Sequence, residues 1–258
     1  MNDELYPMIF KRKSFHTFKD HLKHKDYRED YAISEEELQQ IMTVYDQLEP
    51  LCPDIRTALR IADNEETTCQ RGQEKVLLFY SEEKPNALAN IGFLGEQLDL
   101  YLTKMNIGTL WFGLNKAEMP DHDGMKYVIM IAIGKVPEHA FRKDMFKAKR
   151  KELSEIWEGE ILDGVSEIIR FAPSACNSQP WKVIRENDLL HVYRYRNEHK
   201  IGVMPQDGLV IYNHIDIGIF LCFLELCLRQ EGFICKRTLY EDDRNETMNL
   251  LADYQISR

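Results

Sequence analysis

Two short runs of basic residues stand out because the 258-residue chain is acidic overall, with a formal net charge of −10. The first comprises Lys11, Arg12 and Lys13, with Ser14 and His16 close behind; the second comprises Lys149, Arg150 and Lys151. Guanidinium, ammonium and hydroxyl donors in one place suit an anionic group. The alternative interpretation is a solvated surface patch, as most charge runs are.

Four segments carry a more specific pattern. Residues 172–181 read APSACNSQPW, residues 11–18 read KRKSFHTF, residues 106–113 read NIGTLWFG, and residues 131–137 read IAIGKVP. The first resembles the A-P-S-x-x-N-x-Q-P-W signature of the FMN-dependent nitroreductase family. The second and third are similar to its R-R-S-x-R-x-F and G-L-G-x-x-W-x-G elements, and the last resembles its late core strand. Together the matches extend over most of the chain.

The resemblance implies an α+β, nitroreductase-like fold with an unusual organisation. Members of this family are homodimers that hold FMN at the subunit interface, whereas here the matching segments are divided between the halves of one chain. We therefore expect two tandem half-units, residues 1–140 and 141–258, packed as one globular monomer that mimics the homodimer. The loop at Pro53 lacks the Ser, Asn and Gln of the loop at Pro173, and Asp54 stands where Ser174 does. We therefore expect one intact flavin site, at the loop of Pro173, and one degenerate site, at the loop of Pro53.

The resemblance also assigns roles to individual residues. An FMN phosphate needs cations and donors, for which the candidates are Arg12, Lys13, Ser14, His16, Lys149, Arg150 and Lys151. The ring needs an apolar slot with a few polar groups at its edge, for which the candidates are Leu110, Trp111, Gly113, Pro173, Ser174, Ala175, Asn177 and Gln179. Gln179 has the alternative of holding the loop, and Trp181 is expected in the core. No acid, base or nucleophile stands out, because the flavin itself carries the electrons.

The function implied is electron transfer from NAD(P)H through FMN to a small acceptor such as a nitroaromatic or a quinone. The alternatives are a flavin- or ligand-binding module without turnover and a scaffold that binds no flavin. Cys176 beside the ring is interpreted as a small loop residue rather than a redox thiol.

The elements that must position these residues follow from hydrophobic periodicity. Ser34 and Glu37 form a capping box that begins a helix, and residues 90–106, 154–171 and 216–230 read as further helices. Residues 76–80, 127–133, 189–195 and 233–239 read as strands. Asn90 and Asp216 are interpreted as N-caps, and Gly108 and Gly232 as helix ends.

Parts of this order recur along the chain. Ser34 and Ser154 are 120 residues apart (154 − 34), as are Pro53 and Pro173 (173 − 53), and residues 90–92 resemble residues 216–218. Coincidence among common residues is the alternative, but the shared order favours a duplicated unit.

Composition excludes several classes of function. Negative net charge disfavours nucleic acid and anionic membranes as partners, and the polar N-terminus lacks a secretory signal. The longest apolar stretch, residues 215–228, is too short to span a bilayer and contains Asp216 and Glu225. Six cysteines without a C-x-x-C pair predict reduced thiols and no metal site. We expect a cytoplasmic protein.

Overall fold

The computed structural model describes residues 3–20, 25–113, 117–195, 206–242 and 247–258. The chain divides into two compact units. The N-terminal unit contains residues 7–87 and 94–145, and the C-terminal unit contains residues 1–6, 88–93 and 146–258. Helices and strands alternate in both, so the expected α+β class is confirmed. The predicted boundary between residues 140 and 141 stays a prediction.

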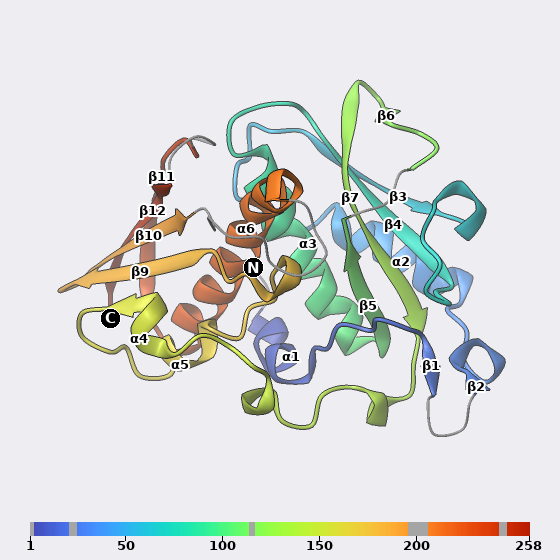
Figure 1. Cartoon of the computed structure of the whole chain (residues 1–258), viewed down its shortest axis with the longest axis horizontal. Helices are drawn as coiled ribbons and strands as arrows, with labels where there is room; N and C mark the ends of the chain where they lie inside the picture. Colours follow the sequence, from blue (N-terminus) through green and yellow to red (C-terminus); the bar gives the residue numbers. More distant parts are fainter. Residues whose placement is uncertain (1–2, 21–24, 114–116, 196–205, 243–246) are drawn as a thin grey trace. The chain divides into compact units, whose positions relative to one another are not determined.

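The N-terminal unit is built on an antiparallel sheet (Figure 1). Its strands are paired in the order β3 (Thr57–Ala62), β4 (Lys75–Ser81), β7 (Met125–Lys135) and β5 (Ile107–Phe112). β6 (Asp121–His122) pairs with β7, and the short strands β1 (Lys19–Asp20) and β2 (Lys25–Asp26) pair with each other. The central strands β4 and β7 are almost wholly apolar and buried, as expected for strands that are covered on both faces.

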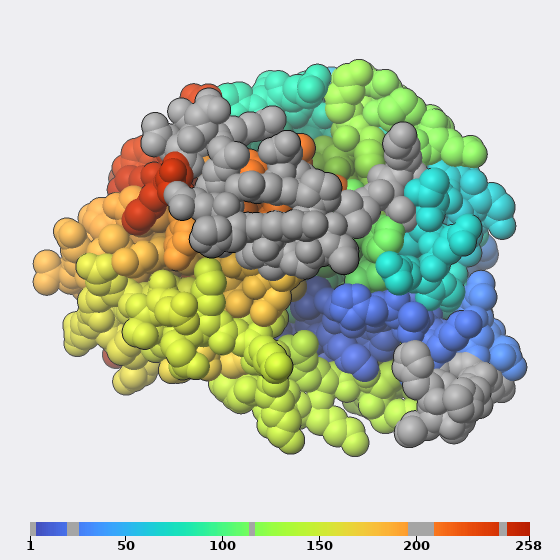
Figure 2. Space-filling model, in the orientation of Figure 1, coloured from blue at the N-terminus to red at the C-terminus, as the bar shows by residue number. Residues whose placement is uncertain are grey.

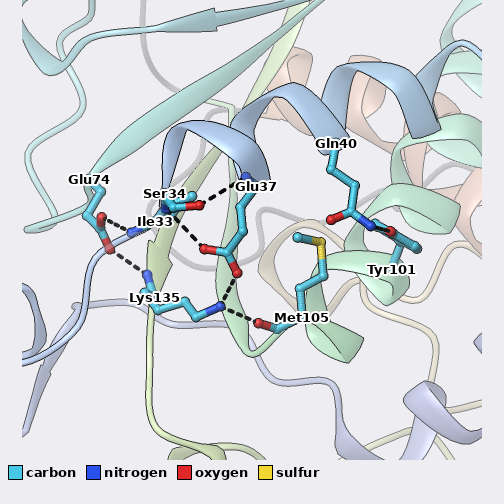
Figure 3. Close-up of polar contacts among 8 residues, drawn as sticks. All are labelled: Ile33, Ser34, Glu37, Gln40, Glu74, Tyr101, Met105 and Lys135. Atoms are coloured by element: carbon cyan, nitrogen blue, oxygen red, sulfur yellow. Dashed lines mark hydrogen bonds and ion pairs between the residues drawn. The ribbon is translucent and has the colours of Figure 1, made fainter.

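The capping box predicted at Ser34 begins α2 (Glu35–Tyr45) and is confirmed. The Ser34 hydroxyl accepts the Glu37 N–H at 3.2 Å, and the Glu37 carboxylate accepts the Ser34 N–H at 3.1 Å. Figure 3 shows that Glu37 also accepts from the ammonium of Lys135, which donates to the Met105 carbonyl at 2.8 Å. The start of α2 is therefore tied to the end of β7 and to the end of α3 (Ala87–Lys104).

The C-terminal unit contains a second sheet, which repeats the pairing order of the first. β9 (Trp181–Glu186), β10 (Leu189–Tyr195), β12 (Met248–Ser257) and β11 (Ile234–Leu239) lie side by side and antiparallel, and β8 (Trp157–Glu158) pairs in parallel with β9. Without β8, the chain order also corresponds: α6 (Gln206–Gln230) follows β10, as α3 follows β4 in the N-terminal sheet. The strands β3, β5, β9 and β12 were not predicted from the sequence.

The helix predicted over residues 154–171 is wrong. This region forms two single turns, α4 (Leu153–Ile156) and α5 (Ser166–Ile169), separated by β8 and a loop. Gly159 and Gly164 have φ of +96° and +73°, a left-handed conformation that a continuous helix does not contain. Residues 158–161, around Gly159, are exposed, and this yellow-green to yellow part of the chain is visible in the space-filling view (Figure 2).

Three of the predicted helix ends also need correction. Asn90 lies inside α3, which begins after Asn86, and Asp216 is the eleventh residue of α6, so neither is an N-cap. Gly108 lies in β5, and Asn106 with φ of 56° makes the turn after α3. Gly232 with φ of +77° follows the end of α6 as predicted.

α6 crosses the first turns of α3 through a pair of glycines within the C-terminal unit. A Cβ added to Gly92 would lie 2.0 Å from the carbonyl oxygen of Ile215, and one added to Gly218 would lie 1.9 Å from that of Ala89. The contact is reciprocal, because each glycine faces the residue three positions before the other. Glycine is required at both positions since no other residue permits backbones to approach this closely.

The predicted apolar stretch, residues 215–228, is part of a longer helical segment, Leu209–Gln230 of α6, which contains an 18-residue window apolar enough to cross a bilayer. However, 83% of this window is buried inside the protein, as in a core helix. The structure describes all six cysteines, and none of them forms a disulfide bond.

Candidate functional site

The N-terminal basic element follows α1 (Tyr6–Lys11) and runs beside β5 in the N-terminal unit. Ser14 forms a parallel bridge with Thr109, and the Phe15 N–H donates to the Thr109 carbonyl at 2.9 Å. The ring of Phe15 is buried and packs on Gly108. Because Phe15 anchors the segment inward, its neighbours Lys13 and His16 are exposed and Ser14 is half-buried. The sequence predicted this cluster, and the structure places it against the β5 residues named with it.

Arg12 is only 4% exposed and lies among carboxylates. Its Nε lies 2.8 Å from Oδ2 of Asp99 and 3.3 Å from Oε1 of Glu96, both on α3. Burial lowers the pKa of the Arg12 guanidinium, but the two carboxylates outweigh burial and the net shift is upward. Burial raises the pKa of Glu96 well above its ordinary value. Arg12 is therefore a buried structural cation, and its predicted contact with a phosphate stays a prediction.

Asp99 joins this element to β5. Its carboxylate accepts hydrogen bonds from the Thr109 hydroxyl at 2.6 Å and from the Trp111 indole N–H at 3.0 Å. The Trp111 ring stacks on Phe79, with ring centroids 6.2 Å apart, and packs over Gly95. Leu110 is buried in the sheet, and Gly113 follows directly after β5. Asp99, Phe79 and Gly95 thus all contact the Trp111 side chain. Its predicted place near a flavin ring stays a prediction.

Lys13 and Arg142 are the cations of the N-terminal unit that best suit an anionic ligand. The Lys13 ammonium donates to the Ala140 carbonyl at 2.9 Å and lies 5.0 Å from the centre of the Phe15 ring. The Arg142 N–H donates to the Lys11 carbonyl at 3.0 Å, which brings Arg142 to the basic element. Burial and the charge of Arg142 lower the pKa of Lys13, while burial and the charge of Arg12 lower that of Arg142. An anion placed between such cations relieves their mutual repulsion.

The 173–179 loop of the C-terminal unit has an unusual backbone. Cys176, Asn177 and Gln179 have φ of 51°, 56° and 47°, so three residues other than glycine adopt the left-handed conformation within four positions. Each costs free energy and persists only where the surroundings impose it. Pro173, Ser174 and Ala175 are half-buried, and Trp181 after the loop is fully buried and stacks on Phe220. The expectation that Trp181 is a core residue is confirmed.

The second basic run, residues 149–151, holds part of the 173–179 loop in its left-handed conformation. Arg150 Nη1 donates to Oδ1 of Asn177 at 2.9 Å, and the Asn177 amide donates to the Lys149 carbonyl at 3.2 Å. The backbone N–H of Lys151 donates to Oε1 of Gln179 at 2.9 Å, and its ammonium donates to the Gln179 carbonyl at 3.0 Å. Asn177 and Gln179 therefore both hold the loop. The sequence assigned Lys149, Arg150 and Lys151 to the FMN phosphate, and that assignment stays a prediction; in the structure this run contacts the loop.

α6 fixes the loop through three polar side chains. Oδ1 of Asp216 accepts the Ala175 N–H at 2.9 Å, and Oδ2 lies 3.4 Å from the Ser178 hydroxyl. Ser178 also lies 3.0 Å from Oδ1 of Asn213. All three side chains are at most 3% exposed, and burial raises the pKa of Asp216 to about 8.

Sequence reasoning missed Asp99, Glu96, Arg142, Asn213 and the role of Asp216. A signal for three of them was present: Glu96, Asp99 and Asp216 are acids in helices that are otherwise apolar, where an unpaired charge is costly. Nothing in the sequence distinguishes Arg142 from its exposed neighbour Lys143. Among the residues that the structure describes, no group of three or more His, Cys, Asp or Glu side chains is arranged to hold a metal ion.

Comparison with known proteins gives one family match. Residues 4–228 match the family described as "Putative TM nitroreductase". The fold is similar to that of a nitroreductase from Thermotoga maritima, with a TM-score of 0.60, 19% identity, and coverage of 99% of this chain and 94% of that chain. Nitroreductases from Desulfitobacterium hafniense and Desulfovibrio desulfuricans, both with FMN, are 17% and 14% identical. Their TM-scores are 0.39 and 0.42, and the alignments cover 59% and 63% of this chain and 100% and 99% of those chains. No curated protein matches.

Proposed function

The chain belongs to the nitroreductase family whose profile matches residues 4–228, and from this we propose that it is an FMN-dependent oxidoreductase. Its electron donor is NAD(P)H, and its acceptor is a small molecule such as a nitroaromatic or a quinone. When bound, FMN supplies the chemistry of electron transfer. The observation that carries the proposal is the 173–179 loop, whose three left-handed residues are held by the basic run of residues 149–151 and by α6.

The residues present fit the phosphate of FMN. A phosphate monoester carries about two negative charges at neutral pH, and Lys13 and Arg142 are cations whose pKa values are lowered in part by neighbouring positive charge. Ser14 and His16 offer additional donors on the same segment. We assign Lys13, Ser14, His16 and Arg142 to the phosphate, and Arg12 to the support of the segment through Asp99.

The loop fits the flavin ring by its small side chains and rigid backbone. Pro173, Ser174 and Ala175 permit a flat ring to approach the main chain closely. Arg150 and Lys151 would keep the loop in place through Asn177 and Gln179, so that no rearrangement is needed on binding. We propose that this loop contacts the flavin ring, that the Lys13 segment contacts the phosphate of FMN, and that Leu110, Trp111 and Gly113 are further ring contacts.

The proposal extends to the organisation of the chain. The two sheets share one pairing order, and α3 and α6 meet in a reciprocal glycine contact. Reciprocal contacts are the mark of twofold symmetry. Both observations support a duplicated chain, which we propose functions as a monomer, and the Ser, Asn and Gln missing from the loop at Pro53 support one flavin site in it. We also propose a cytoplasmic location, where NAD(P)H is present.

The test begins with the purified protein. A flavin spectrum and release of FMN on denaturation are expected, and a protein that neither retains nor binds added FMN would contradict the proposal. Anaerobic addition of NADH or NADPH should then bleach the flavin absorbance, and a nitroaromatic or quinone should restore it. Binding of FMN without bleaching would favour the alternative, a flavin-binding module without turnover.

A further inference from the structure

Asp216, Ser178 and Asn213 form a hydrogen-bonded chain beneath the 173–179 loop. A serine hydroxyl has one proton and can donate to only one acceptor at a time. Ser178 Oγ lies 3.0 Å from Oδ1 of Asn213 but 3.4 Å from Oδ2 of Asp216, so its proton is directed to Asn213. Its lone pairs then face Asp216, and this geometry suits a protonated carboxyl group that donates to Ser178.

The neutral form of Asp216 completes the chain of hydrogen bonds. In that form Oδ1 accepts the Ala175 N–H, a protonated Oδ2 would donate to Ser178 across the 3.4 Å that separates the two oxygens, and the Ser178 proton would go to Asn213. Ionisation would draw the Ser178 proton towards Asp216 and leave Oδ1 of Asn213 without that donor in a buried place. Nδ2 of Asn213 is buried and has no hydrogen-bond partner among the described residues. The ionised form is therefore poorly satisfied in this arrangement.

The charged groups around the loop do not compensate a charge on Asp216. Arg150 and Lys151 are engaged by Asn177 and Gln179 on the loop. On α6, the neighbouring His214 pairs with Asp242, which also accepts from Arg194 at 2.8 Å. Within the described chain, no cation forms an ion pair with Asp216, and its partners are the neutral groups of Ala175 and Ser178.

We propose that Asp216, Ser178 and Asn213 are a proton-linked latch, which holds the 173–179 loop in its left-handed conformation while Asp216 is protonated and loosens it when Asp216 ionises. The latch itself does not depend on the proposed function. Its consequence does: if the protein binds flavin, flavin affinity falls as the pH rises through the titration of Asp216. Asp216 would thus be a positioning residue, since it acts on the flavin through the loop.

The direction of the pH effect follows from linkage. The pKa of Asp216 is about 8 in the folded protein, above the value of an unfolded aspartate near 3.9. Between these pH values the folded state therefore binds more protons than the unfolded chain. The contribution of Asp216 to the free energy of unfolding is highest at low pH and falls as the pH rises towards about 8. Above that pH the ionised form predominates, and the latch opens.

The first experiment follows the latch itself, without flavin. An NMR titration would record the carboxyl carbon of Asp216 and the backbone amide of Ala175 between pH 5 and pH 10. We expect both to titrate together with a midpoint near 8. Asp216→Asn, which keeps an acceptor for Ala175 and a donor for Ser178, should abolish the Ala175 titration, and the exposed control Asp188→Asn should not. A midpoint below about 6, or an unchanged Ala175 titration in Asp216→Asn, would overturn the proposal.

The second experiment measures FMN affinity by fluorescence between pH 7 and pH 9.5, above the second phosphate pKa of about 6. The wild type and Asp188→Asn should lose roughly fivefold to tenfold in affinity across this range, corresponding to about 1–1.4 kcal/mol. Asp216→Asn should change by less than twofold, and Ser178→Ala should weaken binding already at pH 7. An identical pH profile in wild type and Asp216→Asn would contradict the latch. Failure of every variant to bind FMN would contradict the proposed function, while the NMR titration would still decide the latch.

Discussion

The two loops that follow Pro53 and Pro173 differ more than the scaffolds that carry them. Residues 51–56, all of which the structure describes, contain no residue with positive φ. Their loop is held by ordinary contacts, with Lys84 donating to the Asp54 carbonyl at 2.6 Å and Arg56 paired with Glu82 at 2.8 Å. By contrast, the 173–179 loop contains three left-handed residues and is fixed by residues 149–151 and by α6.

The scaffolds, on the other hand, correspond residue by residue. Asn90 and Asp216 are 126 residues apart (216 − 90), as are Gly92 and Gly218, Asp99 and Glu225, and Trp111 and Arg237. Within the N-terminal unit, Asp99 binds Trp111 of β5. Within the C-terminal unit, Glu225 binds Arg237 of β11. The comparison teaches that these packing positions have counterparts in both units, whereas of the two loops only that of residues 173–179 contains left-handed residues other than glycine; this difference is what a single proposed flavin site would require.

The largest expected effect concerns the glycine contact. Gly218→Ala and Gly92→Ala place a Cβ about 2 Å from a backbone carbonyl oxygen, so the helices must separate. Each variant should lose about 3 kcal/mol or more of unfolding free energy, since overpacking against backbone cannot be relieved by a rotamer change. Urea denaturation would measure the loss.

Gly124→Ala is the matched control, because an added Cβ there meets no atom within 4 Å and only its left-handed φ of +77° is strained. It should lose about 1–2 kcal/mol. The reciprocal role of the two glycines would be refuted if the losses of unfolding free energy in Gly92→Ala and Gly218→Ala differed by more than the loss in Gly124→Ala.

A smaller effect is expected for the helix acids. Asp99→Asn leaves the buried Arg12 with Glu96 as its remaining acidic partner, and should cost about 3 kcal/mol. Glu225→Gln should cost less, about 1–2 kcal/mol, because the Arg237 side chain is 22% exposed and that of Arg12 only 5%. Thermal unfolding of both variants tests this order, and a larger loss for Glu225→Gln would reverse the comparison.

The smallest effect is a change in pH dependence. Burial raises the pKa of Glu96 in the folded protein, so the folded state binds more protons than the unfolded chain above pH 4.3. Stability from this group is therefore greatest at low pH and declines as pH rises. Glu96→Gln should remove that decline and gain about 1 kcal/mol at pH 8 relative to pH 5. Denaturation at several pH values would give the free energy of unfolding of the wild type, of Glu96→Gln and of the exposed control Glu186→Gln. If all three depended on pH in the same way, Glu96 would not cause the decline.

The sequence predicted the scaffold better than the connections within it. The capping box at Ser34, the buried strands and the loop at Pro173 carry local signals that tertiary contacts do not override. The helix over residues 154–171 failed because Gly159 and Gly164 adopt left-handed conformations that periodicity does not reveal. Asp216 was misread as a cap because its hydrogen bonds to Ala175 and Ser178 join segments about 40 residues apart.

The same limitation applied to the basic residues. Arg12 carries the family pattern, but its partners Glu96 and Asp99 lie more than 80 residues away on α3. Lys13 and Arg142 can be chosen as phosphate ligands in place of Arg12 only when the three-dimensional neighbours of all three residues are known. Residues 149–151 were assigned to the phosphate because their position in the chain resembled the family's, and their contacts with Asn177 and Gln179 could not be read from the sequence.

The most direct test of the account is the dissociation constant of FMN measured by fluorescence in four proteins: the wild type, Arg142→Ala, Ser174→Ala and Asp54→Ala. Loss of one phosphate cation should weaken binding by roughly tenfold to a hundredfold, and Ser174→Ala should weaken it by about tenfold because Ser174 accepts the Gln179 N–H that closes the loop. Asp54→Ala should bind FMN as the wild type does. Equal affinity in all four proteins, or an equal loss in Asp54→Ala, would contradict one flavin site per chain and the roles proposed for Arg142 and Ser174.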